Sequence, residues 1–248
     1  MKVKLLFVTL ACLIFVISCA KIFVKSSDSA DINKGLLAYY PFNGNAIDES
    51  GNQINGQVNG CELVADRFDK ENSAYYFDGE NDYISFSNNF NFDFNSAFSL
   101  CGWVKTNELQ GLRTIFSKAE NSRNSNNLYV MSIHFQYARG LVRDTVMQDI
   151  NVMGSQQITD NQWHFICLTY DGSSEANGLK IFVDGEFHSA GVKRGNPVSM
   201  STDDPAAIGC EAIGFRSRNY FHGSIDDIRI YDRAINTKEV ALLYSQTE

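Results

Sequence analysis

Short runs in which apolar and polar residues alternate, separated by turn-forming residues, dominate the chain. Near the C-terminus, Ile228 and Ile230 alternate with Arg229 and Tyr231, and this period of two is typical of a half-buried β-strand. Similar runs recur along the chain and predict further short strands in residues 35–42, 74–87, 98–105, 113–118, 128–137, 162–172, 179–189 and 206–210. The sequence contains no repeat and no long helical period. The pattern therefore predicts an all-β protein.

Two local motifs add detail to this prediction. Asp184 and Gly185 stand between two alternating runs and supply the residues with positive φ that a type I′ hairpin turn requires. Asn236 and Glu239 match a capping box, which predicts one short helix ending near Tyr244. We therefore expect a two-sheet antiparallel jelly-roll sandwich with one short C-terminal helix.

Several aromatic residues have the spacing of core positions. Phe90, Phe92 and Phe94 alternate with Asn or Asp, which gives an extended segment one apolar face. Trp103 and Trp163 stand within strand-like runs, where packing is the expected role of a large ring. We expect these five side chains to contribute to the core.

The N-terminus reads as a leader for export. Lys2 and Lys4 precede the apolar run Leu5 to Ile17, which is shorter than a typical membrane span. The run ends in Val16-Ile-Ser-Cys19, which resembles a bacterial lipoprotein signal, and that resemblance implies lipidation of Cys19. An ordinary cleaved signal peptide and an uncleaved anchor are the alternatives.

This leader divides the chain into three parts. We expect a lipoprotein signal peptide in residues 1–18, a polar tether in residues 19–34, and one jelly-roll domain in residues 35–248. The protein would then be exported and lipid-anchored to the bacterial cell envelope, on the outer membrane if the cell has one. The membrane would be a partner only through the lipid.

The charge of the chain argues against two classes of partner. There are 21 basic and 29 acidic residues, a formal net charge of −8, and loss of Lys2 and Lys4 with the leader makes it two units more negative. An acidic protein does not attract nucleic acid or an anionic membrane surface. Carbohydrate, envelope or extracellular protein, and cations remain compatible partners.

Four cysteines remain beyond the leader and Cys19, namely Cys61, Cys101, Cys167 and Cys210. They are far apart in sequence and contain no Cys-x-x-Cys pair, so a zinc site is not expected. An exported protein can join four cysteines into two disulfides in three ways. Buried free thiols that act as small apolar side chains are the alternative, and the sequence does not decide between them.

Six blocks in order resemble the laminin-G-like, concanavalin A-like jelly-roll domains. They are Gly35 to Gly51, Phe77 to Ile84, Phe98 to Lys105, Trp163 to Gly172, Ile181 to Gly185 and Phe221 to Ile235. The likeness covers residues 35–245. It implies two curved antiparallel sheets, with glycan or protein ligands on the concave one.

The same resemblance implies a structural Ca²⁺ where the first and last strands meet. Asp226 matches the last-strand ligand of that site, and Asn43, Asp48 and a backbone oxygen near Gly79 are the further candidate ligands. Oxygen-rich loops of this kind suit Ca²⁺. The alternative is that Asp226 caps backbone amides or pairs with an arginine.

We expect no enzymatic activity. Glycoside hydrolases of this fold class use two carboxylates that flank the scissile bond. In the resembling hydrolases these lie in a Glu-x-Asp-x-x-Glu motif, and here Glu80 to Ser85 supplies its first half only, because Ser85 replaces the second glutamate.

The expected function is non-catalytic recognition, with carbohydrate bound on the concave sheet. Sugar binding needs exposed rings and planar hydrogen-bonding groups. The candidate rings are Tyr129, Phe135, Tyr137 and Tyr220, and Gln136, Arg139 and Arg218 are polar residues near them in sequence. Packing in the core or at the sheet edge is the alternative role for each ring. A protein-binding or adhesion module is the alternative function, and a hydrolase with displaced carboxylates is a third.

Overall fold

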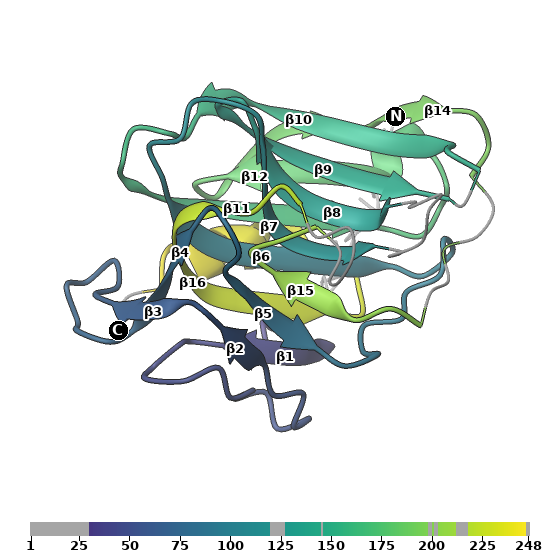
Figure 1. Cartoon of the computed structure of the whole chain (residues 1–248). Helices are drawn as coiled ribbons and strands as arrows, with labels where there is room; N and C mark the ends of the chain where they lie inside the picture. The colour runs from purple at the N-terminus through teal and green to yellow at the C-terminus, as the bar shows by residue number, and fades with distance from the viewer. Residues whose placement is uncertain are drawn as a thin grey trace, which may run out of the picture.

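Alternating strands assemble into two antiparallel sheets that pack face to face (Figure 1). The computed structural model describes residues 30–119, 127–144, 146–197, 200, 203–211 and 218–246. Each sheet has eight strands, and all of the strand pairs run antiparallel. The predicted all-β jelly-roll sandwich is confirmed.

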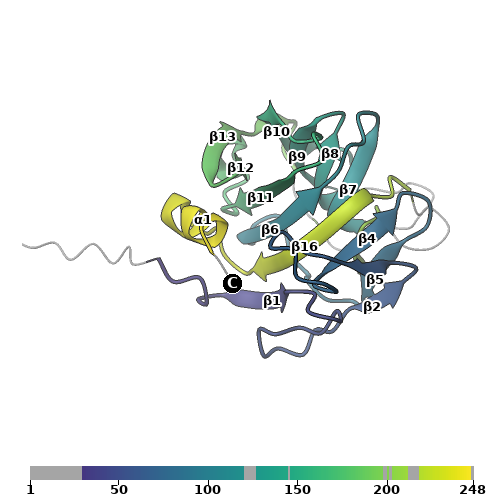
Figure 2. The same ribbon diagram turned by 90° about the vertical axis from the view of Figure 1, so that its left-hand side faces the viewer.

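Sheet A has the order β13-β12-β11-β6-β16-β4-β3, and β1 also pairs with β16. The last strand of the chain, β16, therefore pairs with three strands from its first half, β1, β4 and β6 (Figure 2). The bounds are β1 Leu36–Tyr40, β3 Glu62–Val64, β4 Ala74–Asp78, β6 Phe98–Lys105, β11 Trp163–Tyr170, β12 Leu179–Val183, β13 Glu186–Ala190 and β16 His222–Tyr231.

Sheet B has the order β14-β10-β9-β8-β7-β15-β5-β2, and Figure 1 looks onto its outer face. The bounds are β2 Gln57–Asn59, β5 Tyr83–Phe86, β7 Leu112–Ala119, β8 Asn127–His134, β9 Tyr137–Arg143, β10 Asp149–Gln157, β14 Val192–Arg194 and β15 Ala206–Ile208. A short 3₁₀-helix, η1, covers Ala176–Gly178.

The main core fills the space between the two sheets. Because successive side chains of a strand point to opposite faces, each strand gives every second residue to this core. The sheets approach closely at Gly140 of β9, where an added Cβ would lie 2.1 Å from a methyl group of Leu168 on β11. Phe90, Phe92 and Phe94 are buried in the same cluster, as the sequence predicts.

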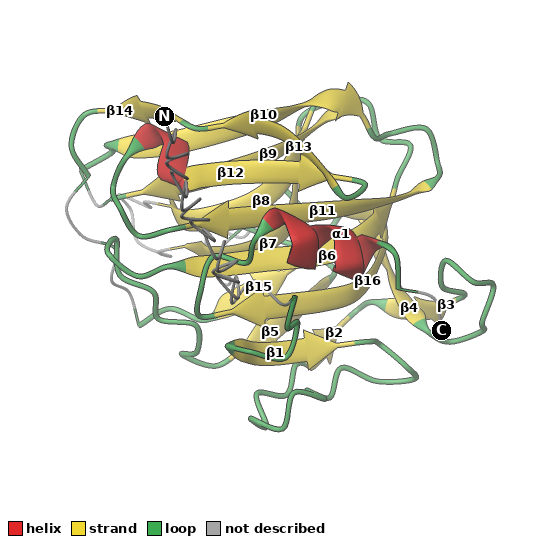
Figure 3. Cartoon of the chain, turned by 180° about the vertical axis from the view of Figure 1, so that it is seen from behind, coloured by secondary structure: helices red, strands yellow, loops and turns green. Residues whose placement is uncertain are grey.

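A second apolar layer covers the outer face of sheet A. Helix α1, Thr237–Tyr244, lies across this face and buries Val240 and Leu243 against it (Figure 3). Burial of side chains of this size contributes about 2 kcal/mol each. Asn236 and Glu239 form the predicted capping box.

Contacts of the domain begin before the predicted start at residue 35. Asp31 donates its backbone N–H to Glu239, and its carbonyl accepts from Arg233, so the end of the predicted tether packs on the fold. Residues 1–29, with the predicted signal peptide and Cys19, lie outside the described residues. Among the described residues, no helix has the length and apolarity needed to cross a membrane.

The structure resolves the open question about cysteines. Cys101 on β6 and Cys167 on β11 are direct cross-strand neighbours and form a disulfide under helix α1. Cys61 and Cys210 carry no disulfide. The disulfide therefore joins adjacent strands in the middle of sheet A.

Candidate functional site

A row of polar side chains crosses the outer face of sheet B. Thr114 on β7 lies opposite Ser132 on β8, and Ser132 lies opposite Arg139 on β9. Their neighbours Ile133 and Ala138 point into the core, so the three polar side chains point outward. The hydroxyls of Thr114 and Ser132 are buried and have no hydrogen-bond partner in the described structure.

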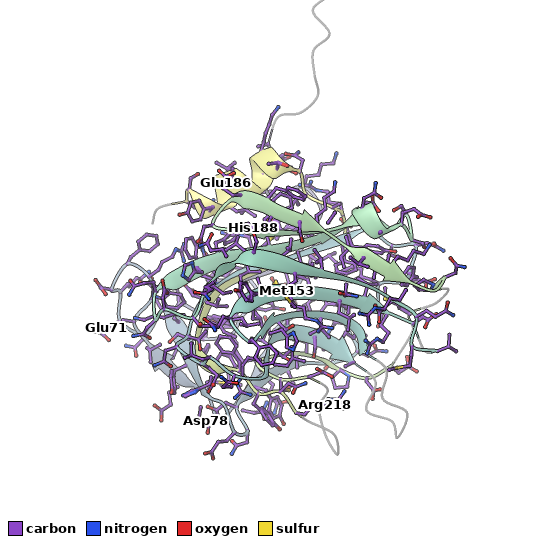
Figure 4. The ribbon with its side chains drawn as sticks, turned by 90° about the horizontal axis from the view of Figure 1, so that it is seen from above. Glu71, Asp78, Met153, Glu186, His188 and Arg218 are labelled. Carbon is purple, nitrogen blue, oxygen red and sulfur yellow. A yellow bond between two sulfur atoms is a disulfide. The ribbon has the colours of Figure 1, made fainter. Side chains whose placement is uncertain are left out.

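This row leads into a groove of about 290 Å³. Segment 218–221 crosses β7 here, and the carbonyl of Asn219 accepts a hydrogen bond from the Thr114 N–H at 2.9 Å. Figure 4 shows Arg218 on the side of the molecule away from Glu186 of β13. We call this site the arginine groove, and its lining residues are Leu112, His134, Arg139, Arg143, Glu211, Arg218 and Asn219.

Ion pairs hold most of the charged groups of the groove in place. Glu211 is 1% exposed, and its carboxylate accepts from Arg218 Nε at 3.0 Å and from Asn219 Nδ2 at 2.8 Å. Arg143 pairs with Asp149 at 3.1 Å. The groove therefore offers fixed donors on rigid strands, with three arginines against one lining carboxylate.

Burial and neighbouring positive charges lower the pKa values of two residues that line the groove. Burial, and then the charge of Arg143, lower the pKa of Arg139. Burial, and then the charge of Arg139, lower the pKa of His134, which favours the neutral imidazole at neutral pH. Positive charges that disfavour one another in this way are relieved when an anion binds between them.

For one of the four rings, Tyr129, the predicted role in sugar binding is wrong. Tyr129 is completely buried, and its hydroxyl donates to the carbonyl of Phe90 inside the sandwich. It is wrong because Tyr129 is at an inward position of β8, next to outward-facing Val130. A ring without exposed surface cannot stack on a sugar.

Two of the other predicted rings lie at the tip of the β8–β9 hairpin, beside the groove. Phe135 is 50% exposed and its ring centre lies 4.7 Å from that of His134, which lines the groove. Tyr137 is half-buried and pairs with His134 in the strand register. Tyr220 is half-buried and follows Asn219 in the chain. The rings border the groove region and are not among its lining residues.

The four predicted calcium ligands do not come together in the structure. The carboxyl of Asp226 accepts a hydrogen bond from Arg67 at 2.7 Å, the arginine pairing that the sequence left as the alternative. Asp48 accepts hydrogen bonds from three backbone N–H groups, those of Tyr39, Ser50 and Ile54. These bonds occupy both of its carboxylate oxygens.

The remaining two ligands are also engaged or distant. Asn43 borders the same cleft as Asp226, and its side-chain oxygen accepts from Lys70 at 3.0 Å. Gly79 lies in the turn after β4, against His222 at the far end of β16. The described residues contain no cluster of three or more His, Cys, Asp or Glu that could hold a metal ion. The donor set thus does not fit Ca²⁺ as one site.

The family of the chain is shown by its sequence. A family model described as the concanavalin A-like lectin/glucanases superfamily matches residues 78–241, well over half of the chain. The chain belongs to this superfamily. The match begins at the last residue of β4 and includes every strand of sheet B except β2, so the arginine groove lies within the matched lectin-like region.

Relatives and solved structures are more distant. Human pentraxin-4 is 27% identical over 158 residues, which are 59% of this chain and 31% of the pentraxin. The binding domain of Paraclostridial mosquitocidal protein 1 has a TM-score of 0.69 at 19% identity, and the match covers 86% of this chain and 52% of that one.

A third similar structure is the binding domain of botulinum neurotoxin DC in complex with SialylT. Its TM-score is 0.60 at 14% identity, and the match covers 86% of this chain and 52% of that one. The chain thus spans about a third of the pentraxin and about half of the toxin chains. At these identities the structural likeness shows the lectin-like fold.

Sequence reasoning named Arg139 and Arg218 only as neighbours of rings and did not identify His134, Arg143 or Glu211 as site residues. One signal was present in the lectin-like sequence. Arg139 and Arg143 are four residues apart on one strand, and an even separation places both on the same face. The contribution of Glu211 depends on a long-range crossing that local patterns do not encode.

Proposed function

We propose that this protein is a non-catalytic recognition module that binds carbohydrate in the arginine groove on the outer face of sheet B. The observation that carries the proposal is a groove with several fixed hydrogen-bonding side chains on a rigid sheet. Sugars present many hydroxyl groups and one apolar ring face. Exposed Phe135 at the hairpin tip supplies an aromatic surface next to those donors.

Membership of the lectin/glucanase superfamily supports this function, as does the similar toxin domain in complex with SialylT. The presence of a single carboxylate among the described lining residues supports binding without hydrolysis. Glycosidic cleavage needs two carboxyl groups flanking the bond. Of the described lining residues only Glu211 is a carboxylate, and Arg218 and Asn219 occupy its oxygens.

The setting we propose is the bacterial cell envelope. The leader and the Val16 to Cys19 motif support export and attachment through a lipid on Cys19. A binding domain held at the cell surface in this way would meet extracellular or envelope glycans.

A glycan array tests the binding function. Detergent-solubilised full-length protein is applied to an array of neutral, carboxylated and sulfated glycans, and we expect reproducible binding to a subset. Arg143→Gln/Arg139→Gln in one chain should lose that binding while the thermal unfolding remains cooperative. Absence of binding to every glycan, with a folded protein, would contradict the function.

A protein ligand is the second candidate. Met153 is 42% exposed and pairs with Arg139 on the same face, so together with Phe135 it gives this face some exposed apolar surface. An array without binding, followed by capture of a defined envelope protein that is lost in the same double variant, would favour this candidate.

A further inference from the structure

Of the described charged groups that line the arginine groove, only the guanidinium of Arg139 has no ion pair or side-chain hydrogen bond. Arg143 pairs with Asp149, and Arg218 pairs with Glu211. Arg139 stands between them on β9, half-buried, and makes no ion pair or side-chain hydrogen bond with any described residue.

Nearby carboxylates are already engaged. The second oxygen of Asp149 accepts from Asn151 at 3.0 Å, and Glu211 uses both of its oxygens for Arg218 and Asn219. Both acids favour the charged form of Arg139 from a distance, but their oxygens are bonded to other groups. A partly buried charge without a hydrogen-bonded partner lowers the stability of the fold. The position of Arg139 therefore favours a partner from outside the chain.

The chemistry of that partner follows from the donor. A guanidinium presents a planar fork of N–H groups that matches the oxygens of a carboxylate or a sulfate. The protein as a whole is acidic, with a net charge of −8, so it does not attract anions through its overall field. Any preference for an anion must come from a local group.

We propose that the arginine groove takes a sugar residue that carries one anionic group, a carboxylate or a sulfate, and that Arg139 holds that group. This inference rests on the proposed carbohydrate-binding function and names the class of sugar. A groove of about 290 Å³ is at the small end of ligand sites, so one sugar residue enters and the rest of the glycan extends past Phe135.

The neighbouring groups suit this assignment. Asn219 and Arg218 also line the groove, and their amide and guanidinium groups carry several N–H donors, which suit sugar hydroxyls as well as Glu211. His134 stands between Arg139 and the ring of Phe135 at the hairpin tip. The anionic group would thus bind at one end of the groove and the apolar sugar face at the other.

The test uses matched glycans and matched variants. Full-length protein in detergent is titrated with an acidic glycan that binds on the array, and with its carboxyl-reduced or desulfated counterpart. We expect the acidic form to bind at least about 10-fold more tightly, in proportion to one charge-assisted hydrogen-bonded pair. Whether carboxylated or sulfated glycans bind identifies the anionic group that the groove accepts.

Arg139→Gln should remove this preference, and Arg139→Lys, which keeps the charge and loses the fork, should retain part of it. Lys180→Gln, at an exposed position of β12 in sheet A, is the control for the same change in net charge. Because Arg139 lacks a partner, Arg139→Gln should leave the melting temperature unchanged or raise it.

The outcomes separate the two ideas. Equal binding of the acidic and neutral forms, or an unchanged preference in Arg139→Gln, would overturn the role of Arg139 while the carbohydrate function stands. Loss of binding together with a lowered melting temperature in Arg139→Gln would show a structural role and would also overturn it. A protein that binds no glycan would fail at the earlier step.

Discussion

A single arginine, Arg67, connects two distant parts of the chain. Its guanidinium contacts Asp226 and Asp227 of β16, each at 2.7 Å, and stacks 4.8 Å from the ring centre of Trp103. Asp227 has a φ of 56° at a bulge of β16, a conformation that aspartate tolerates better than most residues. The bulge allows both adjacent carboxylates to face the same arginine.

Protonation of Asp226 makes this contact dependent on pH. Burial, and then the charge of Asp227, raise the pKa of Asp226 to about 8, against the opposing charge of Arg67. The unfolded chain has the ordinary value of 3.8, so between these values the native state binds more protons than the unfolded state. The stability of the wild type should therefore fall as pH rises through this window.

Asp226→Asn keeps the shape and removes the titration. We expect the melting temperature of Asp226→Asn, measured by thermal unfolding, to rise relative to that of the wild type as the pH is raised from 5 to 8.5. Asp226→Ala leaves a cavity and weakens the pairing of Arg67, so it should lose about 3 kcal/mol of unfolding free energy. Parallel pH curves for Asp226→Asn and the wild type would refute the assignment of this pKa.

The sequence predicted that Asp226 is unusual, but not that its partner is Arg67. Asp226 stands out as a carboxylate inside a strand, and the arginine alternative was open. Arg67 is 159 residues away and enters only when the β3–β4 connection folds over sheet A. The role of Tyr129 was wrong for a related reason, since strand alternation gives two faces without saying which one meets the other sheet.

Among the elements, the β12–β13 hairpin shows how a local motif gains a tertiary contact. Asp184 and Gly185 both have positive φ, as the sequence predicts for this turn. The carboxylate of Asp184 also contacts His164 Nδ1 at 2.8 Å and accepts the N–H of Phe165 at 2.9 Å. The turn is thereby attached to the first residues of β11.

His164 gives this hairpin a pH-dependent contact. Its hydrogen bond to Asp184 raises the pKa of His164 above the ordinary 6.5, and burial opposes the shift, while the charge of Asp184 and then the hydrogen bond to Asp160 add to it. A raised histidine pKa gives stability that is fully present below the unfolded value and is lost as pH rises through the folded value. The melting temperature of His164→Gln should therefore lie furthest below that of the wild type near pH 5.5. The gap should narrow towards pH 9, and a constant gap would speak against this linkage.

The disulfide between β6 and β11 joins two strands that are far apart in the chain. Cys101 and Cys167 are 66 residues apart, and closing a loop of this length contributes about 4 kcal/mol in the chain-entropy model. Peptide mapping of unreduced, denatured protein should find alkylation at Cys61 and Cys210, and at Cys101 and Cys167 only after reduction. Alkylation of all four without reductant would exclude the disulfide.

Local signals predicted some elements and missed others for physical reasons. The hairpin and the capped helix were predicted because their motifs act within a few residues. Strand β10 escaped notice because Gly154, Ser155 and the glutamines at its end favour no strand by themselves. It forms because its partner β9 and the core beneath Ile150 and Val152 stabilise it.

For the whole molecule, the fold follows from blocks spread over the chain, while the binding face does not. Six segments in order suffice to indicate a lectin-like sandwich, since they contribute the central strands of sheet A. The arginine groove depends on which strands become neighbours in sheet B and on the crossing of segment 218–221, which only the folded chain defines. Local sequence blocks thus indicate the fold, whereas contacts between residues far apart in the chain form the binding groove.

A lipid on Cys19 would hold the whole protein in the envelope. The leader predicts cleavage before Cys19 and attachment of lipid to its thiol, so Cys19→Ser should release the protein from the membrane fraction and abolish labelling by a fatty-acid probe. One or two acyl chains give membrane binding through about 0.8 kcal/mol for each buried CH₂, and the mutant has none. Cys12→Ser, in the apolar run, is the control and should remain attached.

The same fractionation separates the alternatives for the leader. An ordinary cleaved signal peptide would leave the wild type soluble and unlabelled, and an uncleaved anchor would keep Cys19→Ser in the membrane. Because the groove lies on the outer face of sheet B, away from the contacts of Asp31, the released Cys19→Ser protein should bind glycan with unchanged affinity. Loss of binding on release would instead show that the anchor or the membrane contributes to recognition.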